Sequence, residues 1–66
     1  SKLRVDCGEV VNEAMVINAA GMVSYGKKVD APYCELDLSN LSKGVYTLQL
    51  VLHNGKVVSR QIVVSK

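Results

Sequence analysis

The alternation of apolar and polar residues is the feature that most constrains the fold of this chain. In the segments 3–7 and 34–38 every second residue is apolar, and the residues between them are charged. A strand that buries one face has this period of two, whereas an amphipathic helix repeats about every 3.6 residues. A register slip of one residue would bury the charges, so the pairing is strongly specified. The pattern predicts an all-β protein.

Two further strands are predicted between these segments. An apolar run covers residues 13–18 and ends at Gly21, which adopts a turn conformation at little steric cost. The pattern resumes over residues 22–29, where Gly26 and the pair Lys27-Lys28 favour a weak, bulged edge strand. Ala31-Pro32 then requires an extended or turn conformation before residue 34, because the proline ring disfavours helix at the preceding residue.

A C-terminal β-hairpin is the strongest local signal. Residues 45–52 and 56–64 are rich in β-formers and are joined by Asn54-Gly55, the preferred pair for a two-residue type I′ turn. Arg60 interrupts the more apolar face of the second strand, so we expect it to reach a sheet edge or to lie over a tyrosine ring. The face of the first strand expected in the core carries Tyr46, Leu48, Leu50 and Leu52.

These segments predict a small immunoglobulin-like antiparallel β-sandwich of about six to seven short strands. A single open sheet would leave one apolar face in water, and the polar link 39–44 is long enough to carry the chain from one sheet to another. The 66 residues suffice for one domain, and a core of this size buries only about 60% of the unfolded surface. We therefore expect one domain, residues 1–66, of modest stability.

The charges and titratable groups exclude several functions. A net charge of +2 from scattered residues gives no footprint for nucleic acid. The single histidine, His53, lies beside the hairpin turn, where we expect a solvated loop residue and not a general base. The carboxylates are scattered singly, and glycine-rich phosphate loops are absent from the sequence. We expect no enzyme activity, no cofactor, no metal site and no small-molecule substrate.

The two cysteines, Cys7 and Cys34, are compatible with one disulfide. The alternation points both sulfur atoms inward but does not fix the distance between their Cα atoms. A disulfide here would add about 3.5 kcal/mol of loop-closure stabilisation. Two buried, reduced thiols are the alternative.

The second half of the chain resembles a known family. The segment 36–46, with the sequence LDLSNLSKGVY, precedes the Asn54-Gly55 hairpin and an apolar end, Ile62-Val63-Val64, that is followed by Lys66. This arrangement is similar to the type A C-terminal sorting domain of type IX secretion, in which an L-(S/T)-x-L-x-x-G-(V/I)-Y segment precedes two terminal strands. Upstream, residues 15–23 resemble the strand, turn and glycine element of that family. A Pro-Asn-Pro-like segment near the start of family members is missing here, so we expect this chain to lack the first strand and the upstream linker.

The resemblance implies a non-catalytic secretion signal. It implies transit through the periplasm and transfer across the outer membrane to the cell surface or the medium. The implied partners are the outer-membrane translocon, a shuttle protein and a sortase that usually removes the domain on surface attachment. The residues implied in the signal are Gly44, Val45, Tyr46, Asn54, Gly55, Ile62, Val63, Val64 and Lys66.

Within this motif, Gly44-Val45-Tyr46 is expected to act mainly as scaffold, because Tyr46 adds a large ring to an otherwise aliphatic core. Recognition would then depend on the terminal hairpin that the motif positions. An open strand edge could also pair with a second copy to give a homodimer. The alternative function is an immunoglobulin-like adhesion or carbohydrate-binding module, for which only Tyr25 and Tyr33 could stack on a sugar.

Overall fold

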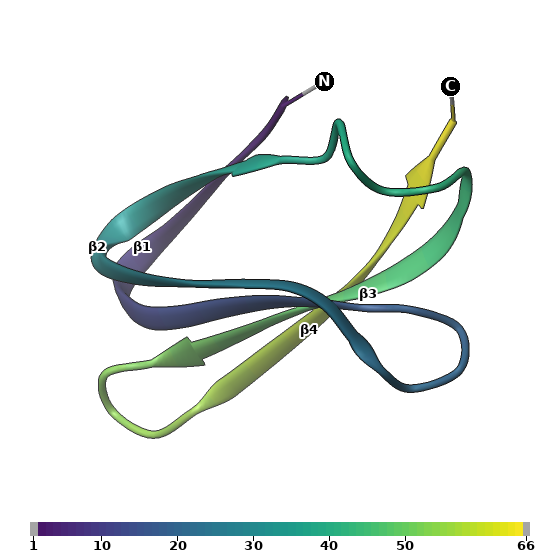
Figure 1. Cartoon of the computed structure of the whole chain (residues 1–66). Coiled ribbons are helices and arrows are strands. Elements are labelled where there is room, and N and C mark those ends of the chain that lie inside the picture. The colour runs from purple at the N-terminus through teal and green to yellow at the C-terminus, as the bar shows by residue number, and fades with distance from the viewer. Residues whose placement is uncertain (1, 66) are drawn as a thin grey trace.

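The computed structural model describes residues 2–65, which form four strands in one antiparallel sheet. The strands are β1 (Lys2–Ile17), β2 (Val23–Asp37), β3 (Gly44–Leu52) and β4 (Val57–Val64). Their order in the sheet is β2-β1-β3-β4, so β2 and β4 are its two edges (Figure 1). The described residues contain no helix long and apolar enough to cross a membrane.

The all-β, antiparallel prediction is confirmed, but the sandwich of six to seven short strands is not. The predicted segments 3–7 and 13–18 belong to one long strand, β1, and the segments 22–29 and 34–38 belong largely to β2. Both strands bend, and the alternation of apolar and polar residues is interrupted at each bend and then begins again. In the sequence, each new stretch of alternation resembles a separate strand.

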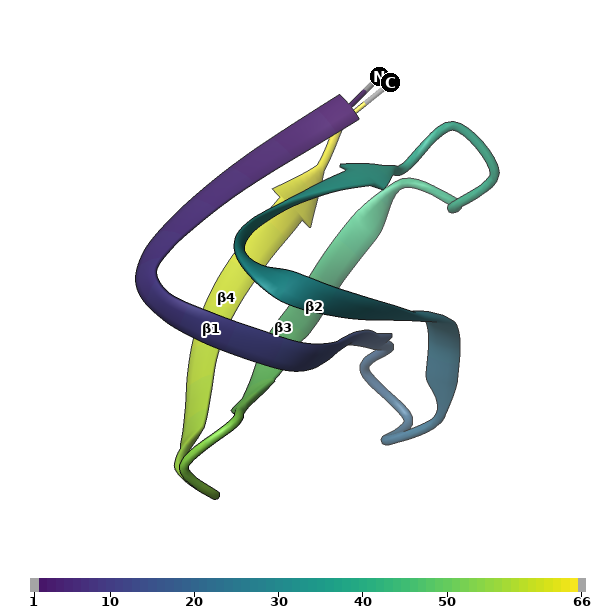
Figure 2. The ribbon, with the colours of Figure 1, turned by 90° about the vertical axis from the view of Figure 1, so that its left-hand side faces the viewer.

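The bend has a backbone cause on each of the two strands. In β1, Gly8 has a φ of 79°, and the pairing with β2 shifts register between Asp6 and Val11. In β2, Asp30 has a φ of 57° and is the one residue other than glycine with a positive φ among those described. Irregularities of this kind turn a strand sharply while pairing continues on both sides. The end of the β1–β2 hairpin far from its turn, residues 2–7 of β1 and 31–37 of β2, therefore arches over β3 and β4, and we call it the arched arm (Figures 1 and 2).

The core lies between this arched arm and the rest of the sheet. Residues from the arm, such as Leu36, belong to the same buried cluster as Leu48 and Leu50 of β3. The link between β2 and β3 closes one end of the cluster with two leucines. The twelve buried apolar residues are Val11, Ala14, Val16, Cys34, Leu36, Leu38, Leu41, Tyr46, Leu48, Leu50, Leu52 and Val64.

The turn between β3 and β4 differs from the predicted type I′ turn. Leu52 accepts a hydrogen bond from the Gly55 amide at 3.0 Å and donates one to the Lys56 carbonyl at 2.8 Å. Gly55 has a φ of 89°, whereas the φ of Asn54 is not positive as a type I′ turn would require. The loop is therefore a type I turn followed by a glycine bulge, with residues 53–55 between the paired residues. The hairpin and its glycine were predicted correctly, and the loop is one residue longer.

The β2–β3 link begins with a local hydrogen-bonded turn at Asp37. Its carboxylate accepts from the Ser39 amide at 3.0 Å and from the Ser39 hydroxyl at 2.5 Å. These hydrogen bonds lower the pKa of the Asp37 carboxyl from its usual value, the hydroxyl contributing most. The link then places Leu38 and Leu41 in the core, and the Leu41 amide donates to the Leu38 carbonyl at 3.1 Å.

Replacing Asp37 with alanine is expected to lower the melting temperature at neutral pH by an amount that disappears in acid. A depressed pKa in the folded state means that the stabilisation is complete above the ordinary aspartate pKa of about 3.9 and is lost as the pH falls through the lower folded value. Thermal unfolding of both proteins between pH 7 and pH 2 measures the difference. Ser39→Ala should show a smaller loss with the same pH dependence, and a difference that stays constant down to pH 2 would contradict this account.

Candidate recognition site on the terminal hairpin

The β3–β4 hairpin separates its residues into a core face and an outer face. Register is unbroken from Gly44 opposite Val64 to Val51 opposite Val57. Even-numbered residues face the core, and in β3 four of them are buried, as the leucine pattern predicted. Odd-numbered residues face outward, and the exposed apolar ones are Val45, Val57 and Val63.

The predicted motif Gly44-Val45-Tyr46 combines a structural and an exposed residue. Tyr46 is buried, and its hydroxyl donates to the Ser42 carbonyl at 2.6 Å, which ties the start of β3 to the preceding link. A Cβ on Gly44 would lie 3.9 Å from Cε1 of that ring, an ordinary contact distance. Val45 points the other way, is 46% exposed and lies directly opposite Val63. Only Val45 of the three exposes an apolar side chain to solvent.

The terminal apolar residues 62–64 are also divided between the core face and the exposed outer face of the hairpin. Ile62 lies opposite Tyr46 and is partly buried against the core, and Val64 is 4% exposed. Val63 between them is 68% exposed, more than any other large apolar side chain described. Lys66, which was also predicted in the signal, lies outside the described residues. The exposed part of the terminal motif is therefore Val63, beside Val45 of the neighbouring strand.

The hairpin tip is fixed to the bend in β1. The Asn54 side-chain oxygen accepts from the Lys56 amide at 3.0 Å, and its amide nitrogen donates to a Glu9 carboxylate oxygen at 3.3 Å. The His53 amide donates to the Val10 carbonyl at 3.0 Å, while the residue remains exposed. The sequence patterns did not predict that Glu9 and Val10 contact the hairpin. A contact between residues so far apart in the chain leaves no local sequence pattern. Asn54 and Gly55 therefore orient the hairpin and form its turn.

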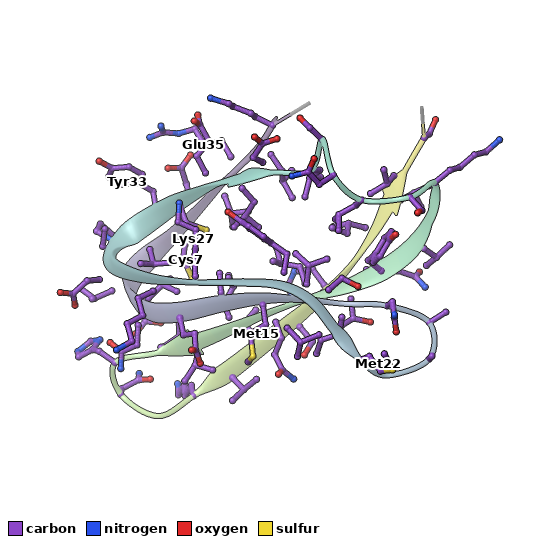
Figure 3. The ribbon with its side chains drawn as sticks, viewed as in Figure 1. Cys7, Met15, Met22, Lys27, Tyr33 and Glu35 are labelled. Atoms are coloured by element: carbon purple, nitrogen blue, oxygen red, sulfur yellow. The ribbon has the colours of Figure 1, made fainter. Side chains whose placement is uncertain are left out.

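The two cysteines lie on the arched arm, away from the hairpin. Val5 is the residue directly opposite Cys34, so Cys7, two positions further along β1, is a diagonal neighbour of Cys34. Figure 3 labels Cys7 in this arm and Lys27 in the other half of β2, from which its Nζ reaches the Glu35 carbonyl at 3.1 Å. Both cysteines are free thiols in the structure, and the disulfide between them stays a prediction. Burial raises the pKa of the Cys34 thiol, which Lys27 partly offsets.

The contacts of Arg60 and Arg4 decide between the two positions expected for Arg60, a sheet edge or a tyrosine ring. The Arg60 guanidinium donates to the Ser59 carbonyl at 2.9 Å on edge strand β4, so the prediction that Arg60 reaches an edge is confirmed. A tyrosine ring is covered by Arg4 instead, whose guanidinium lies 4.6 Å from the centroid of Tyr33. Among residues 2–65, no group of three histidine, cysteine, aspartate or glutamate side chains is placed to hold a metal ion.

The fold and this hairpin define a small antiparallel β domain whose β4 strand exposes valines on its outer face. The family model of the secretion system C-terminal sorting domain matches residues 1–65. The chain therefore belongs to the C-terminal sorting domains of type IX secretion, as the motif in residues 36–46 predicted. No curated protein and no solved structure matches the chain. Membership implies export of the protein that carries the domain across the outer membrane.

Proposed function

We propose that this domain is a non-catalytic signal that directs a cargo protein through the periplasm and across the outer membrane by type IX secretion. The observation that carries the proposal is the family match over residues 1–65. The proposed partners are the outer-membrane translocon, a shuttle protein and a sortase that removes the domain when the cargo is attached to the surface. The domain acts in this scheme as a substrate and a signal, not as a catalyst.

The recognised part is proposed to be the terminal hairpin. Tyr46 and Val64 are buried and support the fold, whereas Val45 and Val63 form an exposed apolar pair on adjacent strands. Adjacent exposed apolar side chains are candidate contact positions for a partner, whereas a single one needs no explanation. Within the proposal, Gly44, Asn54 and Gly55 shape the hairpin, Ile62 holds it on the core, and Lys66 follows it.

The adhesion or carbohydrate-binding alternative has less support. Of the two tyrosines that could stack on a sugar, Tyr25 packs against the core cluster, and Tyr33, although 49% exposed, has one face of its ring against Arg4. A second copy of this chain is a further candidate partner, because β2 and β4 are both sheet edges and could pair between chains.

Deleting residues 62–66 is expected to abolish surface appearance of a reporter that carries this domain and its native upstream linker at its C-terminus. The deletion removes the end of β4, with the exposed Val63 and the buried Val64. The measurement is surface labelling and fractionation of a bacterium with a functional type IX system. The intact fusion is the control, and retention of both fusions in the periplasm would overturn the proposal.

A further inference from the structure

The two edges of the sheet differ in their ability to accept another strand. The β2 edge is bent at Asp30 and contains Pro32 with no amide hydrogen, whereas each edge has one carbonyl that a cationic side chain contacts, Glu35 on β2 and Ser59 on β4. Prolines and bends protect an edge from strand addition. The β4 edge contains neither proline nor glycine over Val57–Val64 and keeps one register throughout. The β4 edge is therefore the better docking edge.

The register defines which backbone groups of β4 are unpaired. Leu52 donates to the Lys56 carbonyl, so this pair is hydrogen-bonded. Hydrogen-bonded pairs alternate along an antiparallel ladder, and the even-numbered residues of β4 therefore bond to β3. The amide and carbonyl groups that point away from β3 belong to the odd-numbered residues Val57, Ser59, Gln61 and Val63. The outward Ser59 carbonyl is covered by Arg60 in the free domain.

A second copy fits this edge poorly. The antiparallel register that places Val57 opposite Val63 of another copy also places the two Arg60 side chains directly opposite each other. Like charges in that position are destabilising. A shift by two residues leaves the arginines as diagonal neighbours and separates the valines. Arg60 therefore disfavours self-pairing and favours a partner with a carboxylate at this position.

We propose that the β4 edge docks an extended strand of the export machinery that carries a carboxylate opposite Arg60 and apolar side chains beside Val57 and Val63. The incoming strand bonds to the outward groups of residues 57–63, and its carboxylate draws the Arg60 guanidinium away from the Ser59 carbonyl. Residues 56–64 contain Lys56 and Arg60 and no acidic residue, so the charge of the edge complements such a strand. This inference rests on the proposed secretion function and specifies its contact.

Ser59→Pro tests the edge, because it removes an outward amide hydrogen and none of the hydrogen bonds to β3. In the reporter assay we expect surface reporter to fall at least about tenfold, the equivalent of about 1.4 kcal/mol of binding. Ser59→Ala, which keeps the amide, should be secreted like the unaltered fusion. Urea unfolding of each purified domain checks that it is folded, and Gln61→Pro tests the same edge if Ser59→Pro is unfolded.

Arg60→Glu tests the charge without altering the backbone. It should reduce the amount of surface reporter about as strongly as Ser59→Pro does. Arg60→Thr should make the purified domain dimerise in sedimentation equilibrium at concentrations where the unaltered domain is monomeric. Normal secretion of folded Ser59→Pro and of Arg60→Glu, with loss only on deletion of residues 62–66, would overturn strand addition and leave the secretion function intact. Normal secretion of the deletion as well would show that residues 62–66 are not the signal, and retention of the unaltered fusion in the periplasm would overturn the function itself.

Discussion

Replacing Leu36 with alanine is expected to remove a large share of the free energy of unfolding of the domain. Leu36 has no exposed surface and lies on the arched arm, where it joins the β2 end of the sheet to the core. Truncation of a buried leucine costs about 2 to 5 kcal/mol, because transfer energy is lost and a cavity remains. At about 0.05 to 0.15 kcal/mol per residue, a domain of this size has a total stability of about 3 to 10 kcal/mol.

Urea unfolding followed by circular dichroism measures this loss as a lower midpoint. Val57→Ala is the matched control, because Val57 is 54% exposed and its truncation should change the free energy of unfolding by less than about 0.5 kcal/mol. An effect of Leu36→Ala no larger than that of the control would show that the arm does not stabilise the rest of the sheet.

The sequence predicted faces and turns better than it predicted connectivity. Alternation identified the inward residues of β3 correctly, because a strand with one buried face requires it. The same alternation suggested too many strands, since a bulged strand and two separate strands have the same local pattern. The positive φ of Asp30 is set by the surrounding sheet and has no sequence signature comparable to a glycine.

The candidate site was only partly predictable for a related reason. The family motif identified Val63 and Val64 together as signal residues. The alternation of the strand then exposes Val63 and buries Val64. Which edge of the sheet is open depends on the order β2-β1-β3-β4 and on the bend of β2 at Asp30. Both result from pairings between distant segments, which local patterns do not encode.

Replacing Val63 with aspartate is expected to reduce secretion of the reporter at least about tenfold while the domain stays folded. Val63 is 68% exposed beside Val45, so the carboxylate remains in water and the fold loses at most about 1 kcal/mol of strand preference. A partner that buries this valine pair would instead have to desolvate the charge, which is costly without a matching cation.

Val23→Asp is the matched control, because Val23 is 57% exposed and begins β2, at the opposite edge of the sheet. It introduces the same charge in place of the same side chain and should leave secretion unchanged. Surface labelling of both fusions, with the urea midpoint of each purified domain, separates recognition from stability. Equal secretion of the two variants would place recognition outside the outer face of the hairpin. Loss of secretion in Val63→Asp alone, at an unchanged midpoint, would identify this face as the contact with the export machinery.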